Sequence, residues 1–364
     1  MRVFSTFSGI SAATVAWRPL GWVMCGYAEI APFQCAVLAE QCGASAPLYL
    51  PEDMSRRNYR HIVGGHIPNF GDITQITDAE LEALGPIDLL EGGSPCQPFS
   101  IAGDRMGLED QRGNLMLEFV RLAERMKTIN GLKYLVWENV KGVLSDATNG
   151  FGSLLGALVG EEHPLLAPGK RWSNSGRVHN AAAQVNIAWR TIDSQFWGVP
   201  QRRERVFLVA NFGGSMECAS SVLFDEGISG WSPESWAGEQ QPRRPDAGEV
   251  HRIEAVSGFN ARVAPTITAN AGGLNRPAGQ GNELQFIITQ FVDPYRAELC
   301  YRRFMPKEVE QLQGFPIGWT DVEYMGKAAL DLHRYKALGN SMSTPVMNFI
   351  GSQIDAVEKR KLAA

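Results

Sequence analysis

The chain has 364 residues, a net charge of −5 and 44% hydrophobic residues, values that are typical of a soluble globular protein. Its length exceeds what one hydrophobic core usually serves, so we expect a large domain and a smaller one. No apolar stretch approaches the roughly 18 residues of a membrane span, and we expect neither an embedded nor a secreted protein. The six cysteines have neither disulfide-framework nor zinc-site spacing, which predicts free thiols in a cytoplasmic protein.

The chain begins with a predicted strand, residues 3–7, followed by a turn of small residues and a helix that starts near Thr14. Backbone N–H groups at such a turn can face a nucleotide-like ligand, although small-residue turns after strands are common without one. A second strand, residues 22–28, ends on Glu29. An acid about 20 residues after the turn can bind both ribose hydroxyls of an adenosine cofactor; otherwise it caps the helix that Pro32 starts.

The next stretch, residues 43–70, is rich in Pro, Gly and polar residues, which predicts a surface excursion. Asp72 follows it and either binds an adenine amino group or caps a turn. The sequence DAELEAL at 78–84 predicts a helix.

A short buried strand, residues 87–90, leads through two glycines to Cys96, which lies between Pro95 and Pro98. The prolines stiffen the loop, and the carboxyl end of a strand is where open α/β sheets keep active sites. Cys96 is therefore a candidate nucleophile, and the alternative is a small buried apolar residue.

The segment that follows Cys96 contains glycines and polar residues, which predicts a loop that closes over a substrate before a helix begins near residue 115. Another buried strand, residues 132–137, ends on Glu138. A thiol and a carboxyl group at neighbouring strand ends can act as nucleophile and acid.

Basic residues open a further strand, in which Gln201, Arg203 and Arg205 alternate and should share one face that can hold a phosphate or a base oxygen. Residues 170–205 contain seven basic and two acidic side chains. Such a cluster is usually a solvated surface, and it indicates nucleic-acid binding only when other features agree. After Asn211 the composition shifts to Gly, Ser, Pro and Trp, which predicts a smaller domain.

Several motifs, taken together and in order, resemble the DNA cytosine-5 methyltransferase family. They are FSGIS, the strand-end Glu29, GDI, GGSPCQPFS, RGNLM, WENVKG, GVPQRRERVF, RRFMPKEVEQLQGFP and YKALGNSMSTPV, and they cover both ends of the chain. The segments RWSNSG and AWRTIDSQFWGVP are most similar to enzymes of phages and prophages.

This resemblance implies a Rossmann-like α/β fold of the class I S-adenosylmethionine-dependent methyltransferases. Residues 1–211 and 323–364 would form the catalytic and cofactor-binding domain, and residues 212–322 a smaller, β-rich target recognition domain. The implied activity is sequence-specific transfer of a methyl group from S-adenosylmethionine to carbon 5 of a flipped cytosine in DNA, which leaves S-adenosylhomocysteine.

The resemblance also assigns roles to individual residues. The implied catalytic residues are Cys96 as nucleophile, Glu138 as acid, Arg205 on the ring oxygen and Arg203 as an ordering residue. Cofactor contacts are implied for Phe7, Ser8, Gly9, Ile10, Ser11, Glu29, Ile30, Asp72, Ile73, Pro95, Leu115, Asn340 and Ser341. Substrate contacts are implied for Gln97, Ser100, Asn139 and Gln201, and the glycine-rich piece around Arg276 is a candidate for reading base edges.

The first motif departs from the family at two positions. The family usually has an acid at the position of Ser5 and a second glycine at the position of Ser11. Backbone N–H donors survive both changes, so we expect altered cofactor affinity and not loss of binding.

The implied partner is double-stranded DNA, bound by a monomer in the cytoplasm of a bacterial or phage-infected cell, with a restriction endonuclease that would act separately and with no membrane. Three other functions stay open: a tRNA cytosine-5 methyltransferase of the same architecture, a catalytically silent DNA-binding regulator, and an enzyme of free nucleotides. The intact Cys96, Glu138 and Arg205 disfavour the second, and the separate smaller domain disfavours the third.

Overall fold

A computed structural model describes residues 1–95, 115–213, 218–225, 227, 229–230, 232, 264, 266–267, 286–293 and 296–363, with the backbone alone for residues 286–303. Cys96, Gln97, Ser100 and Arg276 lie outside the described residues. No helix in these ranges is long and apolar enough to cross a membrane.

A nine-stranded sheet organises the chain, in the order β3-β4-β2-β1-β5-β6-β9-β8-β7. The first six strands in this order run parallel, and β9, β8 and β7 continue the sheet antiparallel. Its strands are β1 (Arg2–Thr6), β2 (Val23–Ala28), β3 (Ala44–Tyr49), β4 (Ile67–Gly71), β5 (Leu89–Gly92), β6 (Tyr134–Val140), β7 (Ser175–Asn180), β8 (Val185–Asp193) and β9 (Glu204–Phe212).

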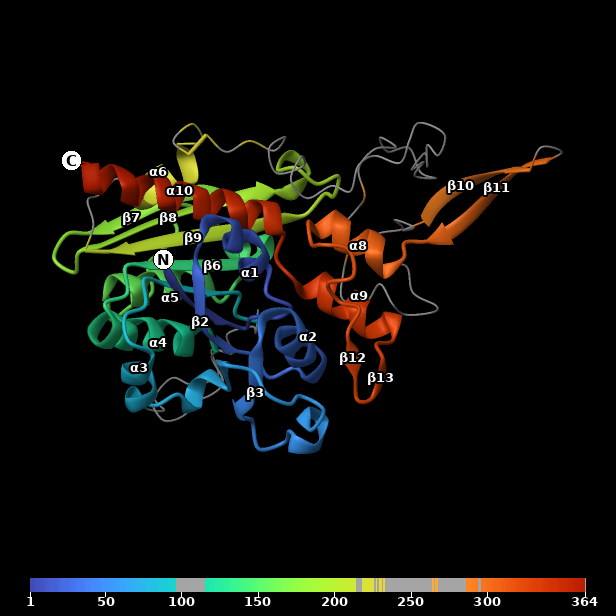
Figure 1. Cartoon of the computed structure of the whole chain (residues 1–364). Helices are drawn as coiled ribbons and strands as arrows, with labels where there is room; N and C mark the ends of the chain where they lie inside the picture. Colours follow the sequence, from blue (N-terminus) through green and yellow to red (C-terminus); the bar gives the residue numbers. More distant parts are fainter. Residues whose placement is uncertain are drawn as a thin grey trace.

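Helices cover both faces of this sheet and make two hydrophobic cores (Figure 1). One core contains residues of α1 (Ala12–Trp17), α2 (Pro32–Cys42), α6 (Cys218–Phe224) and α10 (Thr344–Ala363). The other contains residues of α3 (Asp78–Leu84), α4 (Leu115–Asn130) and α5 (Gly150–Val159). Neighbouring strand residues alternate between them, as Val3 and Phe4 do, which confirms the predicted Rossmann-like α/β fold.

One part of the sequence-based prediction was wrong. Residues 43–70 form β3 and β4 with a loop between them, and not an excursion without strands. Pro47 in β3 and Pro68 in β4 weaken the strand pattern, but β3 is the edge strand of the sheet, where a missing N–H donor is tolerated. Glu138 also lies within β6 and not after it.

The remaining described elements connect the sheet to the end of the chain. They are β10 (Phe286–Asp293) paired with β11 (Arg296–Arg303), α8 (Pro306–Gln313), β12 (Glu323–Tyr324), β13 (Lys327–Ala328) and α9 (Asp331–Asn340). Residues 304–322 contribute Phe304, Val309 and Trp319 to the same core as α1 and α10. The bounds of the smaller domain stay a prediction, because much of 212–322 lies outside the described ranges.

The turn between β1 and α1 holds Phe7, Gly9 and Ser11 in the left-handed region, with φ of 48, 54 and 57°. Glycine adopts this conformation without strain, whereas a residue with a Cβ does not. Ser11 offsets part of that strain by capping α1, since its Oγ accepts a 3.3 Å hydrogen bond from the backbone N–H of Thr14. The serine therefore fits a position that favours glycine.

We expect Ser11→Gly to be more stable than Ser11→Ala by about 1 kcal/mol, because glycine removes the left-handed strain and alanine keeps it while both lose the cap. Urea unfolding of the two purified variants measures this difference directly. If both variants lose the same stability, Ser11 is not strained and the cap alone explains its effect.

Candidate active site at the carboxyl edge of the sheet

The carboxyl ends of the parallel strands β2, β1, β5 and β6 lie next to one another along one edge of the sheet. Strand β9 runs antiparallel to β6, with Val140 opposite Arg205, so the beginning of β9 reaches the same edge. Predicted residues from distant parts of the sequence are thereby brought together. This edge is where open α/β sheets bind their ligands.

Glu29 joins the turn after β1 to the end of β2. One of its carboxylate oxygens accepts a 2.7 Å hydrogen bond from the Gly9 backbone N–H, and the other accepts one from Ala31 at the same distance. Burial raises the pKa of Glu29, and these backbone donors lower it in part. The turn after β1 and the acid at the end of β2 are thus joined, as the sequence predicts.

Two of the other predicted cofactor residues, Asp72 and Ile30, make local hydrogen bonds within the protein. Asp72 caps the short helix after β4, since its carboxylate accepts hydrogen bonds from the Thr74 backbone N–H at 3.0 Å and from Gln75 Nε2 at 3.0 Å. This is the turn-capping alternative of the sequence analysis. The Ile30 carbonyl accepts a hydrogen bond from the Tyr59 hydroxyl, and Ile73 is buried.

The described part of the Cys96 loop ends at the exposed Pro95. Ser94, two residues before the thiol, is held from β6: Trp137 Nε1 donates to its Oγ at 3.0 Å, and Asn139 Nδ2 donates to its carbonyl at 3.1 Å. Sequence analysis gave Asn139 to the substrate and missed Trp137 and Ser94. The motif WENV carried the signal, because it places Trp and Asn on either side of Glu138.

Glu138 lies beside Arg205, whose Nε is 3.2 Å from the Glu138 carboxylate. Burial raises the pKa of Glu138, while the charges of Arg205 and Arg203 lower it in part. Burial favours the protonated carboxyl group, and a carboxylic acid in this form can donate a proton. The structure therefore brings together two of the predicted catalytic residues.

Arg203 is buried and donates to backbone carbonyls of distant segments. It binds the Gly339 carbonyl at 3.2 and 3.3 Å, the Ser341 carbonyl at 2.6 Å and the Ile267 carbonyl at 3.3 Å. Burial and the charge of Arg205 lower its pKa to about 9, against the opposite effect of Glu138. These contacts favour an ordering role over contact with a phosphate.

The other predicted residues lie around this edge. Phe7 faces Phe119 of α4, with ring centroids 6.5 Å apart, and Leu115 begins that helix. Ser8 and Ile10 are buried, Asn340 is exposed at the end of α9, and Ser341 follows it.

Gln201 is fully buried, and in the part of the chain that the structure describes neither polar atom of its side-chain amide has a hydrogen-bond partner. Its backbone forms an isolated bridge with Ala264. An amide in this state retains unused donor and acceptor capacity.

Sequence analysis also missed Glu91, a buried acid in β5 that lies opposite Ser5 of β1. Its signal was an acidic residue inside the apolar run LLEGG, but the neighbour in β1 becomes visible only once the strand order is known.

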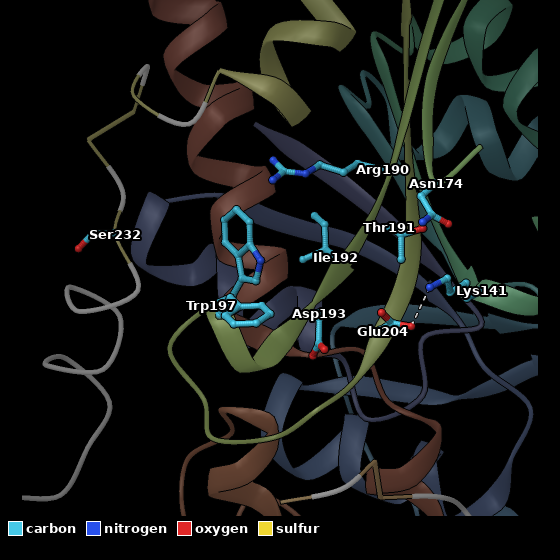
Figure 2. A pocket seen from close by; sticks show the side chains of 10 residues that line it. Lys141, Asn174, Arg190, Thr191, Ile192, Asp193, Trp197, Glu204 and Ser232 are labelled. Carbon is cyan, nitrogen blue, oxygen red and sulfur yellow. Dashed lines mark hydrogen bonds and ion pairs between the residues drawn. The ribbon is translucent and has the colours of Figure 1, made fainter. Parts of the chain in front are cut away.

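A cavity of about 500 Å³ lies beside the beginning of β9, between β8 and the segment that follows it (Figure 2). Lys141 and Glu204 form a 3.0 Å ion pair at its wall, and Asp193 and Trp197 also line it. Of the predicted residues that the structure describes, none lines this cavity. The strand edge, and not this cavity, therefore forms the candidate active site.

Comparisons with known proteins find methyltransferases that are similar to this chain. The chain is 30% identical over 481 aligned positions to a protein of Escherichia phage P1 named DNA N-6-adenine-methyltransferase, covering 96% of this chain and 60% of the relative. It is 38% identical over 147 residues to the type II methyltransferase M.AquIA of Picosynechococcus, covering 39% of this chain and 52% of the relative. The chain thus spans less than two thirds of either relative.

The fold is similar to that of the Schizosaccharomyces pombe Dnmt2 methyltransferase, with a TM-score of 0.59, 17% identity and coverage of 97% of this chain and 98% of that one. The model of the C-5 cytosine-specific DNA methylase family matches residues 1–156. S-adenosylmethionine is the cofactor of that family, so the predicted cofactor is confirmed. Over these residues, less than half of its length, the chain is similar to the C-5 cytosine-specific DNA methylase family.

Proposed function

We propose that this chain transfers a methyl group from S-adenosylmethionine to carbon 5 of cytosine in double-stranded DNA. The observation that carries the proposal is the ion pair of Glu138 and Arg205, whose side chains are 12% and 17% exposed, beside the loop that leads to Cys96. A cytosine needs all three chemistries: a thiol to add to the ring, an acid for ring nitrogen 3 and a cation near the ring oxygen.

The chain's residues have separate tasks in this reaction. The Cys96 thiolate adds to carbon 6 of the ring while protonated Glu138 donates its proton to nitrogen 3, so carbon 5 becomes nucleophilic. Bound S-adenosylmethionine supplies the electrophilic methyl group. Loss of the proton from carbon 5 to a base and of the thiolate from carbon 6 restores the ring, and nitrogen 3 returns its proton to Glu138. Arg205 stabilises the charge that develops on the ring.

The substrate is double-stranded DNA in this proposal because the matched family is one of DNA methylases. The target atom is inaccessible inside a duplex, so the base has to be flipped into the site. The proposed recognition domain, residues 212–322, is long enough to contact DNA bases, with the segment around Arg276 as the candidate for these contacts. The fold alone does not distinguish DNA from tRNA, and the experiment below includes both.

The name of the phage P1 relative suggests a second candidate, transfer to the amino group of adenine. An exocyclic amine attacks a methyl donor directly and needs no thiol addition, so Cys96 would have no task. The chain covers 60% of that relative, which leaves 40% of its length outside the shared part. Cytosine is therefore the favoured base.

Bisulfite sequencing of DNA and of tRNA from cells that express the chain tests the proposal, with Cys96→Ser as the control. We expect protected cytosines in DNA at a defined sequence, and none with the variant. Protection in tRNA alone would select the tRNA enzyme, and N6-methyladenine in DNA without cytosine protection would contradict the proposal.

Incubation with S-adenosylmethionine and a duplex that contains 5-fluorocytosine should trap a covalent complex that survives denaturant. Fluorine at carbon 5 blocks the final proton loss, so the bond to Cys96 persists. Cys96→Ser should form no such complex and still bind DNA, because a hydroxyl is a far weaker nucleophile at neutral pH. An active wild-type enzyme that is never trapped would rule out the covalent route.

Glu138→Gln should lower kcat by about 100-fold or more, because an amide cannot transfer a proton to nitrogen 3. The raised pKa of Glu138 predicts an alkaline limb in the wild-type pH profile, since activity is lost as pH rises through the pKa of the acid. This limb should be absent from the variant's profile. Its persistence in Glu138→Gln would mean that another group is the acid.

Glu29→Ala should weaken binding of S-adenosylmethionine by about 1.5–3 kcal/mol, the range for a hydrogen bond to a charged group. The control is Glu40→Ala, which removes an exposed glutamate from the helix that follows the same strand. Isothermal titration calorimetry compares the two variants. Equal affinities for both would remove Glu29 from the cofactor site.

A further inference from the structure

Glu91 is a buried acid whose role is not explained by the reaction above. Its side chain is 3% exposed, and its Oε2 has no hydrogen-bond partner among the described residues. Within the described part of the chain no Lys, Arg or His forms an ion pair with it. A buried carboxyl oxygen without a hydrogen bond destabilises the fold, and a bound ligand that supplies a donor would remove this cost.

The surroundings of Glu91 belong to the cofactor side of the edge. Ser5 lies directly opposite it in β1, and the Ser5 hydroxyl is 2.9 Å from the Ser8 hydroxyl. Ser8 precedes Gly9, whose N–H binds Glu29. A row of polar groups therefore runs from Glu29 across the ends of β2 and β1 to Glu91.

The two ends of this row correspond to the two polar ends of the cofactor. S-adenosylmethionine has a ribose at one end and, at the other, a methionine part with an α-ammonium and a carboxylate. If Glu29 holds the ribose, the methionine part has to extend away from β2. The next strands along the edge are β1 and β5, so a methionine part that extends along them would pass Glu91.

We propose that Glu91 binds the α-ammonium group of the cofactor's methionine part. The inference rests on the proposed placement of the ribose at Glu29. An ammonium group offers three N–H donors and a positive charge, which together satisfy the free oxygen and balance the carboxylate. No such residue was expected at this position from the sequence motifs.

The surroundings of Glu91 also determine whether its carboxyl group is protonated. Burial and the nearby Glu138 carboxyl group raise the pKa of Glu91 to about 8, and Ser5 lowers it in part. On the β6 side, Glu138 in turn faces Arg205 and Arg203. The free protein therefore holds a proton on Glu91 at neutral pH. A bound cation favours the carboxylate and lowers its pKa, so binding should release that proton.

Calorimetric titration with S-adenosylhomocysteine at pH 6.5, in buffers of different ionisation enthalpy, measures both affinity and proton release. This pH lies below the range in which α-amino groups titrate, so the ligand keeps its charge. We expect release that approaches one proton per ligand in the wild type. Glu91→Gln should release none and bind roughly 10- to 100-fold more weakly, the effect of losing a charged hydrogen bond.

The control ligand is 5′-methylthioadenosine, which keeps the adenosine part of S-adenosylhomocysteine and lacks the amine of its amino-acid part. Its affinity should be the same for wild type and Glu91→Gln, whereas Glu29→Ala should weaken both ligands. Ser5→Asp combined with Glu91→Gln places the acid on the neighbouring strand at the paired position, and it should restore part of the affinity for S-adenosylhomocysteine.

Each result separates this inference from the proposed function. Equal affinity of wild type and Glu91→Gln for S-adenosylhomocysteine would overturn the role of Glu91 and leave the methyltransferase proposal intact. Equal weakening of both ligands by Glu91→Gln would also overturn it, because the loss would then come from a disturbed fold. Absence of S-adenosylhomocysteine binding in the wild type would contradict the cofactor site itself.

Discussion

The buried guanidinium of Arg203 is the constraint on which the candidate active site depends. It joins the beginning of β9 to residues 339–341 and to Ile267 through hydrogen bonds to three carbonyl groups. A buried cation without these acceptors would be strongly destabilising, so the segments have to meet around it. The junction of α9 and α10 is thereby fixed beside Glu138 and Arg205.

Three buried acids at this edge differ in the partners that balance them. Among the described residues, backbone N–H groups bind Glu29, the charges of two arginines balance Glu138, and only Ser5 binds Glu91. The same burial raises the pKa of all three, but the partners decide what each can do. In the proposed reaction, backbone donors leave Glu29 an acceptor for hydroxyl groups, the arginines hold Glu138 near the reacting ring, and the unbalanced Glu91 binds a cation.

The sequence predicts the strands that carry the chemistry because they are buried on both faces and read as short apolar runs. It failed for β3 and β4, where Pro47 and Pro68 interrupt the apolar pattern; β3 is the edge strand, and β4 pairs with both β3 and β2. Strand-end acids were also visible, as Glu29 shows. The partner of Glu91 was not, because Ser5 and Glu91 are 86 positions apart and become neighbours only through the β1–β5 pairing.

The reversal of β9 explains how cations reach an edge made of strand carboxyl ends. In a purely parallel sheet, residues at the beginning of a strand lie at the opposite edge from residues at the end of its neighbour. Because β9 runs antiparallel to β6, Arg205 lies opposite Val140, two residues beyond Glu138. Residues directly opposite and two apart share one face, so Arg205 and Glu138 meet at 3.2 Å. Had β9 run parallel to β6, Arg205 at its beginning would lie at the opposite edge of the sheet, away from Glu138.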